Sequence, residues 1–323
     1  MPDNALEGGA GAASLTPVPA VAPVPSAPSR QAGARAGLAL AALGSIAFSG
    51  KAIIVKLAYR YGVDAVTLIM YRMLFALPLF VALAWWAGRG KAALTRRDLG
   101  VCIGLGFSGY YLASYLDFAG LQYTSAGLER LILYLNPTLV LLLGVVLHGQ
   151  RPRPAQFAAL ALSYAGVALV FGHELDFAGR HALLGAGLVF GSALSYAVYL
   201  AFSGAEVRRL GALRLTGWAS SIACAFCIAQ FLLLRPLAAA LVAPQVLWLS
   251  LLNATLCTVA PVLMVMMAIE RVGATITAQT GAIGPVVTIL MGVVLLGEPF
   301  NGWIAAGTAC VIGGVGLLAR ARR

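Results

Sequence analysis

The chain has 323 residues, of which 61% are hydrophobic and only 10% are charged, whereas soluble domains carry about 25% charged residues. With a mean hydropathy of +0.90, this composition excludes a soluble enzyme and a disordered adaptor, because so few polar side chains cannot cover a water-exposed surface. The net charge of +11 would suggest nucleic-acid binding in a soluble protein. In a membrane protein it instead raises the question of where the cations lie.

Residues 1–35 differ in composition from the rest of the chain, being rich in Ala, Gly, Ser and Pro. We expect a disordered cytoplasmic tail there. The tail lacks the charged start and compact apolar core of a cleavable signal peptide, so the first hydrophobic helix is expected to be retained. The prolines that argue against a helix in this region are Pro17, Pro19, Pro23, Pro25 and Pro28.

Apolar segments of the length that spans a bilayer, about 20 residues, then recur to the end of the chain. Their many glycines and alanines suit close helix packing in lipid. The sequence therefore predicts an all-α integral membrane protein with ten transmembrane helices. The expected spans are 36–57, 65–87, 98–116, 125–147, 154–172, 183–203, 213–234, 245–267, 273–296 and 300–319.

The distribution of Lys and Arg predicts the orientation of these spans. If the N-terminus is cytoplasmic, 15 of the 22 cations fall in cytoplasmic segments and three in outer loops. The positive-inside rule favours this arrangement. We therefore expect a multi-pass protein of a bacterial-type inner (plasma) membrane, with both termini cytoplasmic. Four cations remain inside spans, namely Lys51, Lys56, Arg72 and Arg130.

An internal repeat divides the spans into two halves. Residues 137–150 (PTLVLLLGVVLHGQ) match residues 285–298 (PVVTILMGVVLLGE) at an offset of 148 residues, including one proline and two glycines. We expect a first repeat over 36–172 and a second over 183–319. Each repeat holds five helices, an odd number, so the second enters the membrane from the opposite side. Inverted repeats of this kind are typical of secondary transporters.

With this layout, the chain resembles the drug/metabolite transporter superfamily, and within it the EamA-type transporters. Three stretches carry the resemblance, residues 44–57, 124–137 and 284–299. The resemblance implies alternating-access transport of small metabolites. Gln150 departs from the family, which commonly has Glu after this Gly, whereas Glu298 keeps that pattern in the second half.

Ionisable residues inside spans are costly and usually functional, and here they gather in the first half. The proposed topology places them at similar depth, toward the periplasm. We expect Lys51 to contact substrate or the coupling ion; the alternative is a salt bridge to Glu129 that locks helices together. Lys56 lies nearer the interface and is expected to snorkel. The set is Lys51, Lys56, Arg72, Asp117, Glu129 and Arg130.

Glu129 is the one acid deep enough to carry a proton, and we expect a coupling or gating role for it, or else a structural ion pair. Arg72 contacts cargo or clamps helix-end carbonyls or Asp117. Glu129, Leu133 and Asn136 follow the i, i+4, i+7 spacing of one helical face. Arg130 and Tyr134 lie on another face.

The backbone is expected to break at Pro137 and at the repeat-related Pro285. Broken helices at corresponding positions in both halves point to a central cavity; the alternative is two structural kinks. Further side chains expected to line the pathway are Tyr115, Tyr196, Tyr199 and Gln279.

Cations exceed acids by one in the expected cavity, which favours amino-acid-like or organic-acid cargo over a cationic drug. The sequence thus predicts a secondary transporter of small metabolites, an exporter, with proton coupling left open. A lipophilic-drug efflux pump, a lipid flippase and a receptor are alternatives. An intramembrane enzyme is disfavoured, since no histidine lies deep in a span to serve Ser108 as a base. No cofactor, metal or nucleic-acid partner is expected, and the oligomeric state is open.

Overall fold

The computed structural model describes residues 27–149, 153–178, 180–272, 274–281 and 283–321, so most of the expected tail lies outside it. Within the described part, nine helical stretches are long and apolar enough to cross a membrane. The expected ninth span contributes a shorter apolar helix, 284–296. The protein is thus all-helical, and the ten-helix prediction is confirmed.

The first half runs through α7 and the second half begins at α8. The helices of the first half are α1 (Ala27–Tyr59), α2 (Ala65–Gly88), α3 (Arg96–Gly106), η1 (Phe107–Leu112), α4 (Ala113–Leu121), α5 (Ala126–Leu133), α6 (Asn136–His148) and α7 (Pro154–Ala178). The second half holds α8 (Arg180–Leu210), α9 (Ala212–Leu234), η2 (Leu237–Ala240), α10 (Pro244–Ala254), η3 (Thr255–Val259), α11 (Ala260–Val272), α12 (Ala274–Gly281), α13 (Gly284–Met291), η4 (Gly292–Leu296) and α14 (Gly302–Ala321).

Two boundaries differ from the sequence prediction in ways that matter for the site. Helix α1 begins at Ala27 rather than at residue 36. Pro28 lies in its first turn, where a missing N–H costs no helical hydrogen bond. The third span continues to Leu121 rather than ending near residue 116. Asp117 therefore lies inside a helix and not at its end.

Two π-helical segments interrupt the third and eighth spans. Segment η1 begins at Phe107 and η3 begins at Thr255, positions 148 residues apart, which is the offset of the sequence repeat. Such segments are frequent at functional sites. Each half thus carries the same local irregularity.

The fourth and ninth spans are broken near their prolines. Helix α5 ends at Leu133 and α6 begins at Asn136, with Pro137 in its first turn. Helix α12 ends at Gly281 and α13 begins at Gly284, with Pro285 in its first turn. Residue 282 lies outside the described part.

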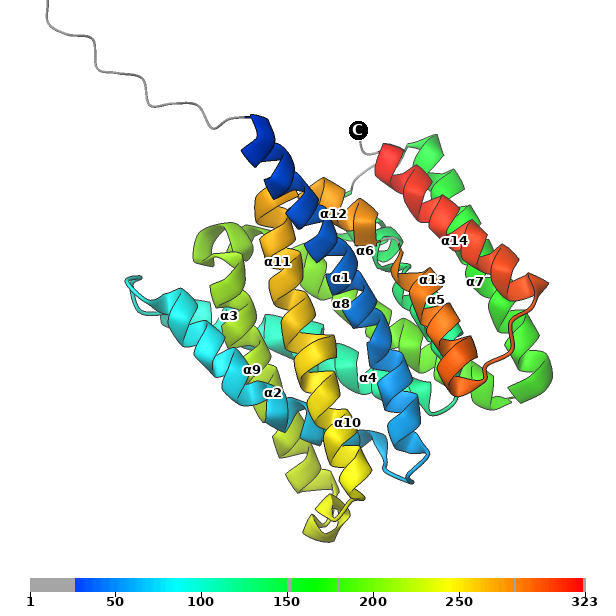
Figure 1. Ribbon diagram of the computed structural model, residues 1–323, viewed down its shortest axis with the longest axis horizontal. Coiled ribbons are helices and arrows are strands. Elements are labelled where there is room, and N and C mark those ends of the chain that lie inside the picture. Colours follow the sequence, from blue (N-terminus) through cyan, green and yellow to red (C-terminus); the bar gives the residue numbers. More distant parts are fainter. Residues whose placement is uncertain (1–26, 150–152, 179, 273, 282, 322–323) are drawn as a thin grey trace, which may run out of the picture.

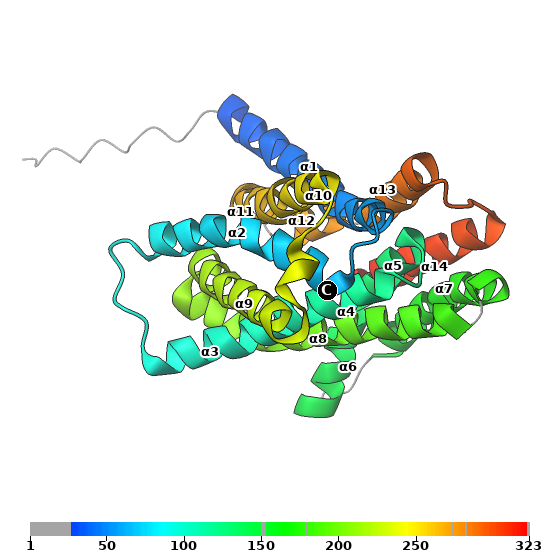
Figure 2. The same cartoon turned by 90° about the horizontal axis from the view of Figure 1, so that it is seen from below.

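The most extensive helix contacts join one half to the other. Helix α2 packs on α9 at one edge of the molecule and α7 packs on α14 at the opposite edge (Figures 1 and 2). Between them α1 packs along α11, and α4 packs along α8. The repeat relates these last two pairings to each other, because α1 corresponds to α8 and α4 corresponds to α11. The start of α1 and the end of α14 lie on the same side of the molecule (top in Figure 1).

Candidate functional site

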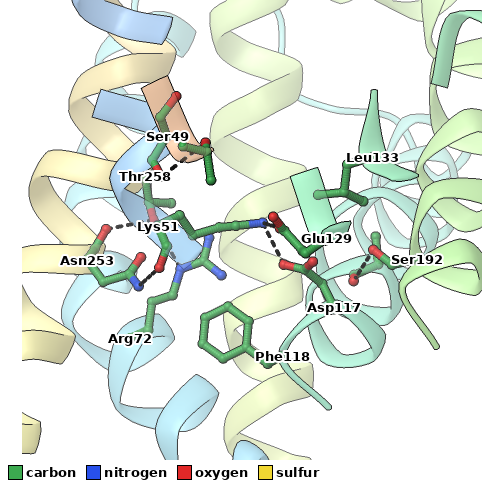
Figure 3. A network of polar contacts seen from close by, with 12 residues as sticks. Ser49, Lys51, Arg72, Asp117, Phe118, Glu129, Leu133, Ser192, Asn253 and Thr258 are labelled. Atoms are coloured by element: carbon green, nitrogen blue, oxygen red, sulfur yellow. Dashed lines mark hydrogen bonds and ion pairs between the residues drawn. The ribbon is translucent and has the colours of Figure 1, made fainter. Parts of the chain in front are cut away.

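Three ionisable side chains meet between α1, α4 and α5. Lys51 Nζ lies 2.5 Å from Asp117 Oδ2 and 3.1 Å from Glu129 Oε1. The side chains are 14%, 3% and 0% exposed, respectively. We call these three residues the Lys51 cluster (Figure 3). The predicted alternative of a Lys51–Glu129 salt bridge is present, and Asp117 is a second acid on the same ammonium group.

Local sequence explains how each acid reaches this point. Ser125 caps α5, its hydroxyl accepting a hydrogen bond from Leu128 N at 3.0 Å. Glu129 therefore lies in the first turn of α5, where the helix dipole favours a negative charge. Asp117 comes from α4, which η1 joins to α3.

Arg72 continues the polar network toward the second half. Its Nε donates to Thr258 Oγ1 at 3.0 Å, and its guanidinium carbon lies 5.1 Å from the centre of the Phe118 ring. Thr258, in η3, donates to Asn253 O at 2.8 Å. Asn253 Nδ2 in turn donates to Lys51 O at 3.4 Å. Arg72 thus contacts a threonine hydroxyl and an aromatic face, because η3 brings Thr258 to Arg72, and its clamp on helix-end carbonyls or Asp117 stays a prediction.

Arg130 links the cluster region to the broken ninth span. Its Nη2 donates to Ser49 Oγ at 3.3 Å, and Ser49 Oγ donates to Gly284 O at 3.0 Å. Ser45 Oγ donates to Gly281 O at 3.0 Å. The carbonyls on both sides of the break between α12 and α13 are thus bound by hydroxyls of α1.

Some buried polar atoms of this region have no hydrogen-bond partner within the described residues. They include Arg72 Nη1 and Asn253 Oδ1. An unpaired buried polar atom costs about 1–3 kcal/mol. A buried donor and a buried acceptor near Lys51 thus lack partners among the described residues.

One end of the region is closed by contacts between the halves. Glu298, which follows η4, accepts hydrogen bonds from Ala126 N at 2.8 Å and Gly127 N at 3.3 Å, at the start of α5. Arg60 Nη2 donates to Leu296 O at 3.0 Å. We call this the Glu298 end. Lys56 lies there too, donating to Thr124 O at 2.6 Å.

A cavity of about 560 Å³ opens at the Glu298 end, lined by Lys56, Arg60 and Glu298 among others. None of Lys51, Asp117 and Glu129 lines it. The Lys51 cluster lies about one helical turn deeper, because Ser125 and Lys56 are four and five residues from Glu129 and Lys51. The cavity and the Lys51 cluster are therefore separate in this conformation.

The tyrosines expected at the site contact other groups. Tyr199 forms an aromatic group with Tyr110 and Tyr196: its hydroxyl is 3.1 Å from that of Tyr110, and its ring centre is 5.4 Å from that of Tyr196. Tyr115 packs in the apolar core beside α2. Gln279 belongs to α12, but its side chain lies outside the described part.

The break after Leu133 changes the interpretation of two further residues. Asn136 does not continue the face of Glu129, since α5 has ended. Its Nδ2 donates to Leu133 O at 2.6 Å and so binds the interrupted backbone. Tyr134 packs in the apolar cluster around Leu131. Both residues thus contact groups other than Lys51 in the described part of the chain.

Sequence reasoning gave no site role to Ser45, Ser49 and Glu298, and it named Asp117 as an ionisable candidate without placing it beside Lys51. Asp117 was taken as a helix end, and its burial depends on the longer third span. Ser45 and Ser49 occur four residues apart on α1, a spacing that places both on one face. Glu298 was identified as a family feature only, whereas the structure gives it a partner 171 and 172 residues away.

Comparison with known proteins identifies the relatives of this chain. The sequence profile of the EamA-like transporter family matches residues 35–172 and again residues 183–320. An uncharacterized transporter of Bacillus subtilis, YcbK, is 28% identical over 82% of this chain and 86% of its own length. A second from the same organism, YetK, is 25% identical over 76% and 75%.

The fold also occurs among solved structures. One crystal structure, titled only as that of a protein, covers 91% of this chain and 99% of its own, with a TM-score of 0.57 and 22% identity. At this identity the likeness concerns the fold alone.

Proposed function

Since the chain belongs to the EamA-like transporter family, we propose that it is a secondary transporter that exports small carboxylate-bearing metabolites, amino acids or organic acids, by alternating access. We place it in a bacterial-type inner membrane with both termini cytoplasmic, as the Lys and Arg distribution favours. Its repeats, 36–172 and 183–319, act as the two exchanging halves.

The observation that carries the proposal is the pair of acids on Lys51. Asp117 and Glu129 both contact one ammonium group in a buried setting. A cargo carboxylate has the same chemistry as either acid and can take its place on Lys51. Arg72 Nη1 and Asn253 Oδ1 then supply a donor for the carboxylate and an acceptor for an amino group.

The same exchange gives a route to proton coupling. An acid displaced from Lys51 would be a buried charge without a partner, which is strongly unfavourable. Protonation of that acid removes the charge. Because Glu129 is fully buried and Asp117 nearly so, either can hold the proton while cargo occupies Lys51, and release it when cargo leaves.

The position of the cluster suits alternating access. Second-half residues complete its surroundings, through Asn253 and Thr258 on one side and Gly284 on another. Relative motion of the halves would therefore change the access to Lys51 directly. In this conformation, Glu298 and Arg60 join the halves at one end.

The test is counterflow in proteoliposomes loaded with unlabelled amino acids, dicarboxylates or a cationic dye. We expect exchange of one carboxylate-bearing class, its loss in Lys51→Met, and loss of its pH dependence in Glu129→Gln. Lys56→Met, on the same helix but bonded to a carbonyl, is the matched control and should retain exchange. Dye exchange without carboxylate exchange, or unchanged transport in both cluster variants, would overturn the proposal.

A further inference from the structure

A second cavity lies at the opposite end of the molecule from Glu298. Its volume is about 530 Å³, and it is enclosed by the end of α2, the start of α3, the loop between them and the first turns of α9. The long loop that joins α2 to α3 projects at one edge of the molecule (Figure 2). We call this cavity the α2–α3 pocket.

The charged side chains that line the α2–α3 pocket are all positive. Lys91, Arg96 and Arg214 line it, and no acid is among its lining residues. Asp98 is the acid of the first turn of α3, but its carboxylate accepts a hydrogen bond from Thr95 N at 2.9 Å and is paired with Arg209. The three lining cations therefore face no compensating charge from the pocket wall.

One of these cations is incompletely bound. Arg214 Nη2 donates to Ala92 O at 2.6 Å, which holds the guanidinium in place against the loop. Its Nε is buried and has no hydrogen-bond partner in the described part of the chain. The guanidinium is thus held at one nitrogen, and the geometry of its planar donors matches phosphate oxygens.

The remaining wall is apolar and aromatic. Trp85 and Trp218, 63% and 37% exposed, line the pocket together with Leu94 and Leu99. Arg89 lies over the Trp85 ring, 3.8 Å from its centre. Tryptophans gather at the level of lipid headgroups, so this pocket opens where charge and hydrocarbon meet.

We propose that the α2–α3 pocket binds the phosphate of an anionic membrane lipid through Lys91, Arg96 and Arg214, with the lipid chain against Trp85, Leu99 and Trp218. Basic pockets between helix ends are suited to such headgroups. The site is separate from the Lys51 cluster and does not depend on the cargo. Because α2 packs against α9 of the other half, a lipid bound there stabilises a contact between the halves.

The test measures thermal stability of the purified full chain in detergent during titration with phosphatidylglycerol. We expect a rise in Tm with phosphatidylglycerol and little with phosphatidylcholine, because only a ligand of the folded state stabilises it. In Lys91→Gln/Arg96→Gln the concentration for half-maximal effect should rise about 30-fold, the loss expected for two cations at a lipid surface.

Two controls separate the pocket from general charge effects. Arg35→Gln/Arg320→Gln removes two exposed cations elsewhere and should respond like the wild type. Lys91→Arg/Arg96→Lys keeps both charges and should also retain the response, which distinguishes a lost site from a damaged fold. Equal responses in all variants would overturn the proposal.

The source of the phosphate is tested in parallel with inorganic phosphate and glycerol 3-phosphate. Neither should raise Tm at concentrations where phosphatidylglycerol does, because neither has a chain to lie against the aromatic wall. Stabilisation by these soluble phosphates, lost in Lys91→Gln/Arg96→Gln, would assign the pocket to a soluble anion and refute the lipid assignment.

Discussion

Replacing Lys51 by methionine removes the cation that two buried acids share. The substitution keeps most of the side-chain volume, so packing around α1 changes little. Asp117 and Glu129, 2.5 and 3.1 Å from the ammonium group, are left as buried carboxylates without that partner. The expected effect on stability is therefore electrostatic.

The magnitude can be worked out in two ways. Breaking a buried ion pair by removing one partner costs about 3–5 kcal/mol. Alternatively, the carboxylate that has lost its partner can take up a proton. A carboxyl group has an ordinary pKa of about 4, so protonating it at pH 7 costs about 4 kcal/mol. Both routes predict that Lys51→Met lowers the free energy of unfolding by about 4 kcal/mol. The loss should shrink at acidic pH, where protonation removes the negative charges.

The measurement is reversible unfolding in mixed micelles with increasing dodecyl sulfate, followed by circular dichroism. Lys56→Met is the control on the same helix. Its ammonium group donates to Thr124 O and Leu121 O, so the loss should be near 2 kcal/mol, within the range of about 1.5–3 kcal/mol for hydrogen bonds that involve a charged group. The triple variant Lys51→Met/Asp117→Asn/Glu129→Gln should recover most of the stability, because neutral groups replace the whole network.

Two results would refute this reasoning. If Lys51→Met unfolds like the wild type, the two acids are not destabilised by losing their shared cation. If the triple variant is as unstable as Lys51→Met, the loss comes from packing rather than charge. Transport should be lost in both variants, whatever their stability.

Three further predictions follow from other contacts. Glu298→Ala should lower stability by about 1–2 kcal/mol, through loss of a charged cap on α5, and should speed labelling of a cysteine placed at Ser125; equal labelling would show that Glu298 does not close this end. Gly166→Ala should destabilise by about 1–3 kcal/mol through overpacking, because its Cβ would lie 2.6 Å from Gly307 O, while Gly316→Ala, which meets nothing within 4 Å, is the control in the same unfolding assay. Burial raises the pKa of Asp64, but hydrogen bonds from Thr67 and from Arg235 outweigh it and leave the pKa below its ordinary value. The stabilising effect of the carboxylate should therefore be complete above the ordinary pKa and lost as the pH falls through the lowered one. Because Asn still caps a helix as well as Asp, Asp64→Asn should cost only the exposed ion pair with Arg235, about 0.5–1 kcal/mol at pH 7, and nothing at the acid end of a pH series of unfolding curves.

The sequence by itself determined the architecture of this protein. Spans of about 20 apolar residues are required by bilayer thickness, and their number and length could be read directly from hydropathy. The repeat, the family and the breaks near Pro137 and Pro285 were also visible, because a proline lacks the N–H that a helix interior needs. Charged residues inside spans identified Lys51, Arg72, Glu129 and Arg130 as candidates, since burial of charge in lipid is costly.

Only the tertiary structure decided which of those residues meet. Asp117 belongs to the Lys51 cluster because the third span runs one turn further than its hydropathy suggested, through a π-helical segment that no residue pattern announces. Thr258 reaches Arg72 for a similar reason, and Glu298 caps a helix more than 170 residues earlier in the chain. Tyr110 and Thr258 lie 148 residues apart, at corresponding places in η1 and η3, yet Tyr110 bonds to Tyr199 and Thr258 to Arg72. Helical period and hydropathy describe one segment at a time, whereas these contacts depend on how two halves pack against each other.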